Sequence, residues 1–264
     1  ERAGKKAEEI DMVILGSSNM QRSYPAMAVE VQQLLGANGF GYDMNVACST
    51  ATFAIINAYN AIKAGAAKTV LVVNPEFTTP QLDYTNRDSH FIFGDVATAV
   101  VVESEETAKS DRQFKIVNTD QLTQYSTNIR CSHSYVDHCY DELPEDNSFF
   151  FQEGRKVFKE LLPIVTSTIS SHLDHNQWSV EQVKRMWLHQ ANINMNLFAA
   201  KKLLGREPEF LDAPLILDEY ANTASAGSVV ALHKYQDDFE SGDKGILCSF
   251  GAGYSVGCIS LERI

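Results

Sequence analysis

Three residues that lie far apart in the sequence carry the side chains that covalent acyl chemistry requires. Cys48 opens a helix-like run of small residues, His189 begins the tetrad His-Gln-Ala-Asn, and Asn222 begins the run Asn-Thr-Ala-Ser-Ala-Gly. A thiol can attack a thioester, while an imidazole and a carboxamide can donate hydrogen bonds to an oxygen that becomes negative. The trio therefore predicts an enzyme that transfers acyl groups through a cysteine.

The surroundings of Cys48 favour a nucleophile. A short predicted strand at residues 42–46 leads into it, and apolar residues then recur at helical spacing over residues 49–64. A helix N-terminus stabilises a thiolate through its free N–H groups and partial positive charge, so we expect a lowered pKa for this thiol. A cysteine beside a helix is more commonly a buried structural residue, and the position between strand and helix favours the reactive alternative.

His189 and Asn222 are weak signals when each is taken alone. Most histidines are ordinary core or surface residues, and most asparagines before a helix are caps or turn residues. Predicted strands at residues 186–188 and 215–217 precede the two side chains. Because open α/β sheets place their sites at the carboxyl ends of strands, we expect both residues to converge with Cys48.

A turn of small residues near the C-terminus supplies a fourth element. Predicted strands at residues 245–250 and 255–261 form a terminal hairpin around Gly251-Ala252-Gly253. Small residues let backbone N–H groups approach a reacting atom, so the amides of Cys48 and of this turn could form an oxyanion hole. A plain hairpin turn is the alternative.

Strands and helices alternate along the chain, which favours a layered α/β fold with much parallel pairing. Buried apolar runs predict further strands at residues 11–17, 69–73, 97–102 and 114–117. Helical spacing predicts helices at residues 25–35, 152–172, 194–204 and 223–235. Residues 120–150 are polar, and we interpret them as a surface excursion.

Size and charge narrow the class of protein. The chain has 264 residues, of which 44% are hydrophobic and 21% charged, so it can bury a large core. The formal net charge of −12 argues against general nucleic-acid binding, although a few local basic residues can still dock an acidic partner. The sequence contains no run of 18 apolar residues, so no membrane span is expected. The start of the chain has no signal-peptide pattern.

The cysteines argue against zinc and disulfides. The sequence holds five, with no Cys-x-x-Cys spacing, which fits a reducing cytoplasm. Cys131, His133, His138 and Cys139 could gather a metal ion on paper. An ordinary polar loop is the favoured interpretation, because the spacing is unlike that of known ligand sets.

Five segments together resemble the β-ketoacyl-acyl-carrier-protein synthase III family of the thiolase superfamily. They are residues 43–50, 85–99, 188–192, 221–227 and 250–257, and they follow the family's order along nearly the whole chain. The resemblance implies an α/β protein with a five-layer αβαβα fold made of two similar halves. Residues 1–110 would form the first half with the nucleophile, and residues 111–264 the second half with the histidine and the asparagine.

The resemblance also implies the roles of individual residues. Cys48, His189 and Asn222 would form a catalytic triad, with the amides of Cys48 and Ala252 as the oxyanion hole. The residues expected to bind substrate are Arg87, near the nucleotide of coenzyme A, and Asn192, Phe250 and Gly251.

Substrates and partners follow from the same resemblance. An acyl-CoA primer would load the cysteine and malonyl-acyl carrier protein would be condensed with it by decarboxylative Claisen chemistry in fatty acid biosynthesis, with no cofactor and no metal. The family is typically a homodimer that pairs edge strands, a role that we expect residues 97–102 to take.

The chain departs from the family at several positions. Leu188 replaces a proline, Ala221 and Ala252 replace glycines, and Asn194 stands where the family has an arginine linked to carrier or CoA docking. The family's first strand–helix–strand, which would precede Glu1, is missing, so the first half is incomplete. We expect those residues to exist as a separate or disordered segment.

Three alternatives stay open. A related condensing enzyme of secondary metabolism, of the long-chain, polyketide or quinolone type, fits the same motifs. A non-catalytic acyl-binding partner subunit would be expected to lose a triad residue, and all three are present. A thiol protease or amidase would use His189 as a base for Cys48.

Overall fold

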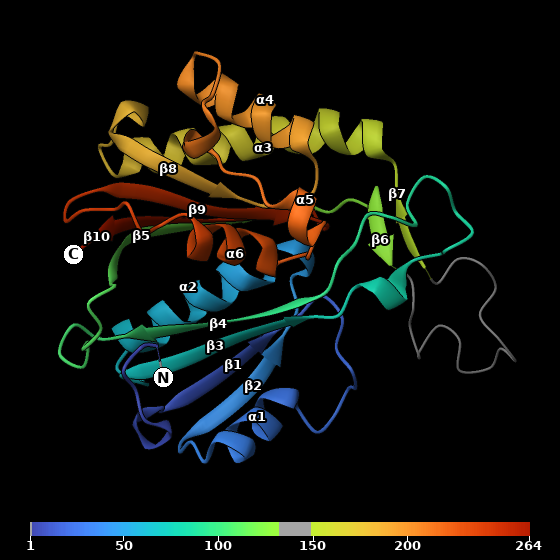
Figure 1. Ribbon diagram of the computed structural model, residues 1–264. Helices are drawn as coiled ribbons and strands as arrows, with labels where there is room; N and C mark the ends of the chain where they lie inside the picture. Colours follow the sequence, from blue (N-terminus) through green and yellow to red (C-terminus); the bar gives the residue numbers. More distant parts are fainter. Residues whose placement is uncertain (1, 132–148) are drawn as a thin grey trace, which may run out of the picture.

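The computed structural model describes residues 2–131 and 149–264, and it has five layers. Figure 1 shows helices α3 and α4 over one sheet, α2 and α6 in the middle, a second sheet, and α1 on the outside. The predicted five-layer αβαβα arrangement is confirmed. The strands are β1 (Met12–Gly16), β2 (Phe40–Met44), β3 (Thr69–Glu76), β4 (Val96–Glu103), β5 (Phe114–Thr123), β6 (Ile129–Cys131), β7 (Phe150–Gln152), β8 (Val183–Leu188), β9 (Lys244–Gly251) and β10 (Ser255–Arg263). The helices are α1 (Met27–Leu35), α2 (Thr50–Lys63), α3 (Gly154–His175), α4 (Ile193–Leu204), α5 (Leu217–Tyr220) and α6 (Ala226–Lys234).

The two four-stranded sheets each combine parallel and antiparallel pairs. The first has the order β2-β1-β3-β4, with β1 parallel to both neighbours and β4 antiparallel to β3. The second has the order β5-β10-β9-β8, with β8 parallel to β9 and β10 antiparallel to β9. The first sheet therefore has three parallel strands and one antiparallel strand, whereas in the second sheet β10 runs antiparallel to both β9 and β5. The carboxyl ends of β1, β3, β8 and β9 lie toward one end of the molecule (Figure 1).

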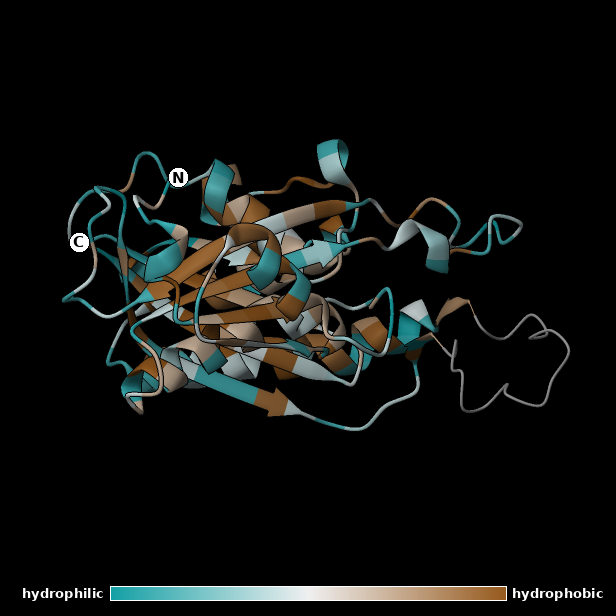
Figure 2. Ribbon diagram, turned by 90° about the horizontal axis from the view of Figure 1, so that it is seen from below, coloured by the Kyte–Doolittle hydropathy of each residue, from teal (hydrophilic) through white to brown (hydrophobic). Residues whose placement is uncertain are grey.

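Alternating side chains explain why β1 is buried on both faces. Met12 and Ile14 join the central core with α2 and α6, while Val13 and Leu15 pack under α1. Successive side chains of a strand point to opposite faces, so an unbroken apolar run fits a strand between two helical layers. Figure 2 shows the same distribution, with hydrophobic strands inside and hydrophilic loops around the rim.

Small residues let α2 lie in the middle layer. Ala51, Ala54 and Ala58 have no exposed surface, so the helix can approach both sheets closely.

None of the helices in the described ranges has the length and apolar character that a membrane span needs.

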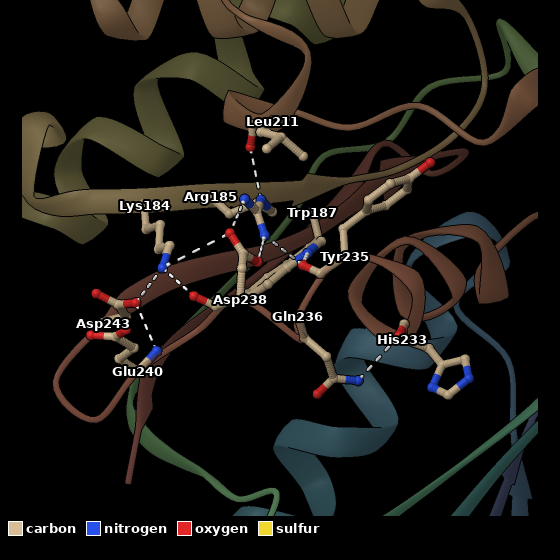
Figure 3. A network of polar contacts seen from close by, with 10 residues as sticks. All are labelled: Lys184, Arg185, Trp187, Leu211, His233, Tyr235, Gln236, Asp238, Glu240 and Asp243. Carbon is tan, nitrogen blue, oxygen red and sulfur yellow. Dashed lines mark hydrogen bonds and ion pairs between the residues drawn. The ribbon is translucent and has the colours of Figure 1, made fainter.

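The amino end of β8 is fixed by an ionic network in which the arginine is buried and the carboxylate partner is exposed (Figure 3). Arg185 is 2% exposed, and its guanidinium donates to both carboxylate oxygens of Asp238 at 2.6 and 3.0 Å. It also donates to the carbonyls of Leu211 and Tyr235, at 2.8 and 2.9 Å. These bonds attach β8 to the segments around it. His189, which follows the other end of the strand, therefore has a fixed position.

Two predictions of secondary structure are wrong. Residues 215–217 form no strand, because the N–H of Ile216 binds the side chain of Gln190 at 3.0 Å and its carbonyl accepts from Glu219 and Tyr220. Both backbone groups are therefore unavailable to a sheet, and the short helix α5 starts instead. The excursion also begins later than expected, since β5 pairs with β10 as far as Thr123.

The short strands β6 and β7 pair within the remainder of the predicted excursion. Residues 132–148 lie outside the described residues. They include His133, His138 and Cys139, three of the four residues that could bind a metal ion by residue type.

Candidate active site

Cys48 lies in a single 3-10 turn between β2 and α2. The turn spans Ala47–Ser49, and α2 starts at Thr50. Gly251, the last residue of β9, packs directly on the cysteine: a Cβ at this glycine would lie 2.8 Å from the Cys48 Sγ atom and 2.4 Å from its Cβ. Such distances are too short for any side chain, so glycine is required for the backbone of the turn to reach the thiol.

The expected low pKa of Cys48 is wrong. Burial raises the pKa of the thiol to about 11, and the negative charge of Glu76 adds to that rise. The backbone of Ala252 hydrogen-bonds the sulfur and opposes the shift. The free N–H groups of the turn lower the pKa of Cys48 less than the loss of water raises it. The resting group is therefore a neutral thiol at pH 7.

His189 directly follows β8 and is only 2% exposed. Its N–H donates to the carbonyl of Cys248 at 2.9 Å, which continues the pairing of β8 with β9. The ring meets Phe250 edge-on, with centroids 5.4 Å apart. Within the described residues, its Nδ1 atom has no hydrogen-bond partner.

The environment keeps this imidazole neutral. Burial lowers the pKa of His189 to about 4, and a backbone hydrogen bond with Ala224 acts in the opposite direction. A neutral ring has one N–H and one free lone pair. Its one N–H bonds the backbone of Ala224 in the resting site, and a substrate oxygen that replaced this acceptor would receive the bond at pH 7 without a positive charge in the core.

Asn222 lies in the loop between α5 and α6, not at the end of a strand as predicted. Its side-chain oxygen accepts from the N–H of Ala224 at 2.9 Å. This bond fixes the orientation of the carboxamide, because only the oxygen can accept. The NH₂ end is thereby left to donate to a substrate. The backbone of Asn222 pairs with Ile92 and Gly94, at 3.0 Å each.

The structure brings most of the predicted residues to one place. Gly251 contacts Cys48, Phe250 contacts His189, and Ala224 bonds both His189 and Asn222. A continuous set of contacts therefore joins the thiol, the imidazole and the carboxamide at the ends of β8 and β9.

Two predicted residues lie apart from this group. Arg87 is exposed in the loop before β4. Asn192 is exposed and caps α4, because its side-chain oxygen accepts from the N–H groups of Asn194 and Met195 at 2.8 and 3.3 Å. The cap gives Asn192 a structural role, and its contact with a substrate stays a prediction.

Strained alanines flank the group. Ala47 precedes Cys48 with φ of 46°, Ala221 precedes Asn222 with φ of 55°, and Ala224 has φ of 45°. Non-glycine residues avoid positive φ, and such strain collects at functional sites where surrounding contacts hold it. The alanine at 221, where a glycine was expected, therefore stores strain beside the carboxamide.

Sequence reasoning missed Glu76. This carboxylate ends β3, is 2% exposed, and acts on the pKa of Cys48. The only signal in the sequence is an acidic residue that closes an apolar strand. Its hydrogen-bonding partners, Ser18 and Ser225, come from distant segments and could not be read from spacing.

The five-layer arrangement is the thiolase fold of condensing enzymes, and a cysteine, a neutral histidine and an asparagine lie together in it. Residues 42–121 match the sequence profile of 3-oxoacyl-[acyl-carrier-protein] synthase III, and residues 173–263 match the profile of its C-terminal part. The chain belongs to this family. It is an acyltransferase that performs Claisen condensation in fatty acid biosynthesis.

Individual relatives agree with the family. The chain is 55% identical to the β-ketodecanoyl-[acyl-carrier-protein] synthase of Pseudomonas aeruginosa, over 100% of this chain and 75% of that protein. It is 31% identical to the β-ketoacyl-[acyl-carrier-protein] synthase III of Brucella suis, over 98% and 79%.

Solved structures give the same picture. The synthase III of Aquifex aeolicus superposes with a TM-score of 0.83 at 26% identity, covering 97% of this chain and 78% of that one. The priming β-ketosynthase of the R1128 polyketide pathway superposes with a TM-score of 0.87 at 25% identity, covering 98% and 76%.

Proposed function

We propose that this enzyme condenses a medium-chain acyl-CoA with malonyl-acyl carrier protein through an acyl-Cys48 intermediate. The contact of the Cys48 thiol with the backbone of Gly251 and Ala252 carries the proposal, because it pairs a nucleophile with an amide donor. The 55% identical relative is named for a ten-carbon β-ketoacyl product. Condensation adds two carbons, so we propose an eight-carbon primer, octanoyl-CoA. This refines the long-chain alternative.

The first half-reaction loads the cysteine. The Cys48 sulfur attacks the thioester carbonyl, and the resulting oxyanion accepts hydrogen bonds from the amides of Cys48 and Ala252. When the C–S bond to coenzyme A breaks, the thiol proton passes to the leaving thiolate. The raised pKa of Cys48 makes loss of this proton part of the acylation step, since little thiolate exists beforehand at pH 7.

The second half-reaction forms the carbon–carbon bond. His189 and the NH₂ group of Asn222 donate to the thioester carbonyl of the malonyl group. The C–C bond to the carboxylate breaks, carbon dioxide leaves, and the two donors stabilise the enolate. The enolate carbon attacks the acyl carbonyl, the bond to Cys48 breaks, and the freed thiolate takes a proton from solvent.

A neutral His189 suits this step. A protonated ring would lie in a site that is 2% exposed, where burial already lowers the pKa to about 4. A neutral donor stabilises the enolate without transferring a full proton to it, so the carbanion keeps its nucleophilic character.

The finer predictions on binding and assembly are part of the same proposal. Arg87, Asn192, Phe250 and Gly251 would bind the substrate, and the halves 1–110 and 111–264 would work together in a cytoplasmic homodimer. Both β2 and β4 lie at edges of the first sheet. The strand expected to pair, residues 97–102, lies in β4, whereas exposed apolar residues such as Leu34 and Phe40 lie on the β2 side.

Primer competition tests the proposed function. Purified enzyme is given malonyl-acyl carrier protein with acetyl-, octanoyl- or dodecanoyl-CoA, and β-ketoacyl product and released carbon dioxide are measured. We expect octanoyl-CoA to give the highest kcat/KM. A preference for acetyl-CoA would overturn the primer length alone, and absence of product from every primer and of carbon dioxide would overturn the condensation itself.

A further inference from the structure

Glu76 is a buried carboxylate that neither half-reaction uses. It ends β3 and is 2% exposed. One oxygen, Oε2, accepts from the N–H and the hydroxyl of Ser18 at 3.0 and 2.7 Å, and more weakly from the hydroxyl of Ser17 at 3.4 Å. The other oxygen, Oε1, accepts from the N–H of Ser225 at 3.2 Å and from its hydroxyl. The carboxylate thus joins the end of β1 to the start of α6.

The bonds to Ser225 reach the loop that carries Asn222. Residues 221–225 connect α5 to α6, and the backbone of Asn222 near the other end of this loop is paired with Ile92 and Gly94. Glu76 ends β3, and residues 92–94 precede β4, so both attachments come from the connection between these two strands. Asn222 is therefore held from the first half of the molecule at both ends of its loop.

The connection is itself rigid. The hydroxyl of Thr78 donates to the carbonyl of Gly94 at 2.8 Å, and its N–H donates to Asp95 at 2.7 Å. Strands β3 and β4 and their hydrogen-bonded connection form a rigid frame to which the loop of Asn222 is attached. A frame of this kind sets the direction of the Asn222 carboxamide more narrowly than the loop could alone.

A carboxylate at position 76 indicates a role beyond packing. All the groups that bind Glu76 in the described contacts are neutral hydroxyls and amides. Burying an ion among neutral donors costs more than burying an amide of the same shape. Burial accordingly raises the pKa of Glu76, while the bonds from Ser225 and Ser18 lower it.

We propose that Glu76 is a positioning residue for the decarboxylation step, which acts through Ser225 to fix the loop that aims Asn222. The proposal rests on the proposed function, in which Asn222 serves condensation and Cys48 serves acylation. Loss of the attachment should impair the second half-reaction more than the first.

The charge of Glu76 supplies an independent readout. Among the described residues, Glu76 at the end of β3 is the charged group that acts on the pKa of Cys48. His189, which follows β8, is neutral, and the turn at residues 250–253 and the start of α2 bring no charged side chain. Glu76 raises the pKa of Cys48. Glu76→Gln keeps the size of the side chain and removes the charge, so the pH profile of acylation should move to lower pH.

Two serine variants make the sharpest test. Ser225→Ala and Ser18→Ala each remove one hydroxyl from the same carboxylate and leave the backbone donor, yet only Ser225 belongs to the loop of Asn222. Acylation is followed by intact mass with octanoyl-CoA, and decarboxylation by release of carbon dioxide from malonyl-acyl carrier protein.

We expect Ser225→Ala to slow decarboxylation by about 10-fold while acylation changes by less than about 2-fold, from the size of one charge-assisted hydrogen bond. Ser18→Ala should leave both rates close to those of the wild type. Glu76→Gln should slow decarboxylation and shift acylation to lower pH.

Equal losses in Ser225→Ala and Ser18→Ala, or equal losses of both half-reactions in Glu76→Gln, would overturn the positioning role. The serine pair stays informative if the Glu76 variant does not fold. A wild-type enzyme that neither acylates nor releases carbon dioxide would refute the proposed function, which is a different result.

Discussion

Two buried histidines show how a reactive group differs from a structural one in this molecule. His172 in α3 is 0% exposed, and both of its ring nitrogens are bonded: Nδ1 to Asp120 at 2.6 Å and Nε2 to Ser260 at 2.7 Å. His189 is 2% exposed, and its Nδ1 has no described partner. Burial lowers the pKa of both rings, so their protonation alone does not distinguish them.

The His172 group has the order of a serine hydrolase triad, with a carboxylate, an imidazole and a hydroxyl. Ser260 has no exposed surface, and its hydroxyl is also bound by the side chain of Asn176 at 2.6 Å. A substrate could not reach this oxygen. The group is therefore a fully satisfied network that joins α3, β5 and β10, whereas His189 packs on Phe250, next to the glycine that contacts the thiol, and keeps one ring nitrogen without a described partner.

The largest expected difference between the two histidines is in turnover. His189→Ala should reduce condensation by about 10²–10³-fold, because it removes one of two donors to the enolate. Acylation, followed by intact mass, should fall much less. His172→Ala should retain the kcat of the wild type per folded molecule, since His172 contacts no group of the candidate site.

The comparison would fail if His172→Ala lost condensation as severely as His189→Ala while remaining folded by circular dichroism. It would also fail if His189→Ala condensed normally.

The pH dependence of stability should sharpen the comparison. The pKa of His189 is about 4 in the folded protein and 6.5 in its ordinary state, so the unfolded chain binds the proton more readily. Its contribution is fully present above pH 6.5 and is lost as the pH falls toward 4, by about 3 kcal/mol in total. Urea unfolding at several pH values should show a shallower loss in His189→Ala. The same slope in variant and wild type would contradict the assigned shift.

At pH 7, His172 should contribute more to the free energy of unfolding than His189, which is the reverse of their order in turnover. His172→Ala should lower the free energy of unfolding by about 2–4 kcal/mol, because it opens a cavity and removes the bonds of Asp120 and Ser260 to the ring. His189→Ala should cost less, since its side chain makes fewer hydrogen bonds. Urea titration measures both, and a larger loss in His189→Ala would reverse the interpretation.

The smallest expected effect concerns strain beside Asn222. Ala221 has φ of 55° and ψ of −157°, a region that favours glycine. Ala221→Gly should raise the free energy of unfolding by about 1 kcal/mol. Ala61→Gly, a matched change inside α2, should lower it by about 1 kcal/mol. Destabilisation in both variants would mean that Ala221 is not strained.

Local patterns predicted a layered α/β fold and the three candidate residues, the family resemblance predicted the five layers and the residue roles, and tertiary context decided the rest. Hydrophobic periodicity was sufficient for β1, α2 and the terminal hairpin, because each buries its own apolar residues. It failed at Ile216, where the side chain of Gln190 takes a backbone donor that a strand would need. The pKa of Cys48 was predicted in the wrong direction, since burial depends on residues brought together only by folding.

Glu76 was missed for the same reason. Its two attachments, Ser18 and Ser225, are 58 and 149 positions away in the sequence. Spacing along one strand or helix carries no information about such contacts, which arise when β1 pairs with β3 and α6 packs on β3.

The most direct test of the account is the intact mass of the protein after incubation with octanoyl-CoA, compared with Cys48→Ser. We predict a gain of one octanoyl group on the wild type, none on the variant, and loss of the group when malonyl-acyl carrier protein is added. An adduct that persists in Cys48→Ser, or a wild-type protein that takes up no acyl group from any acyl-CoA, would contradict Cys48 as the nucleophile of an acyl-CoA-primed condensation.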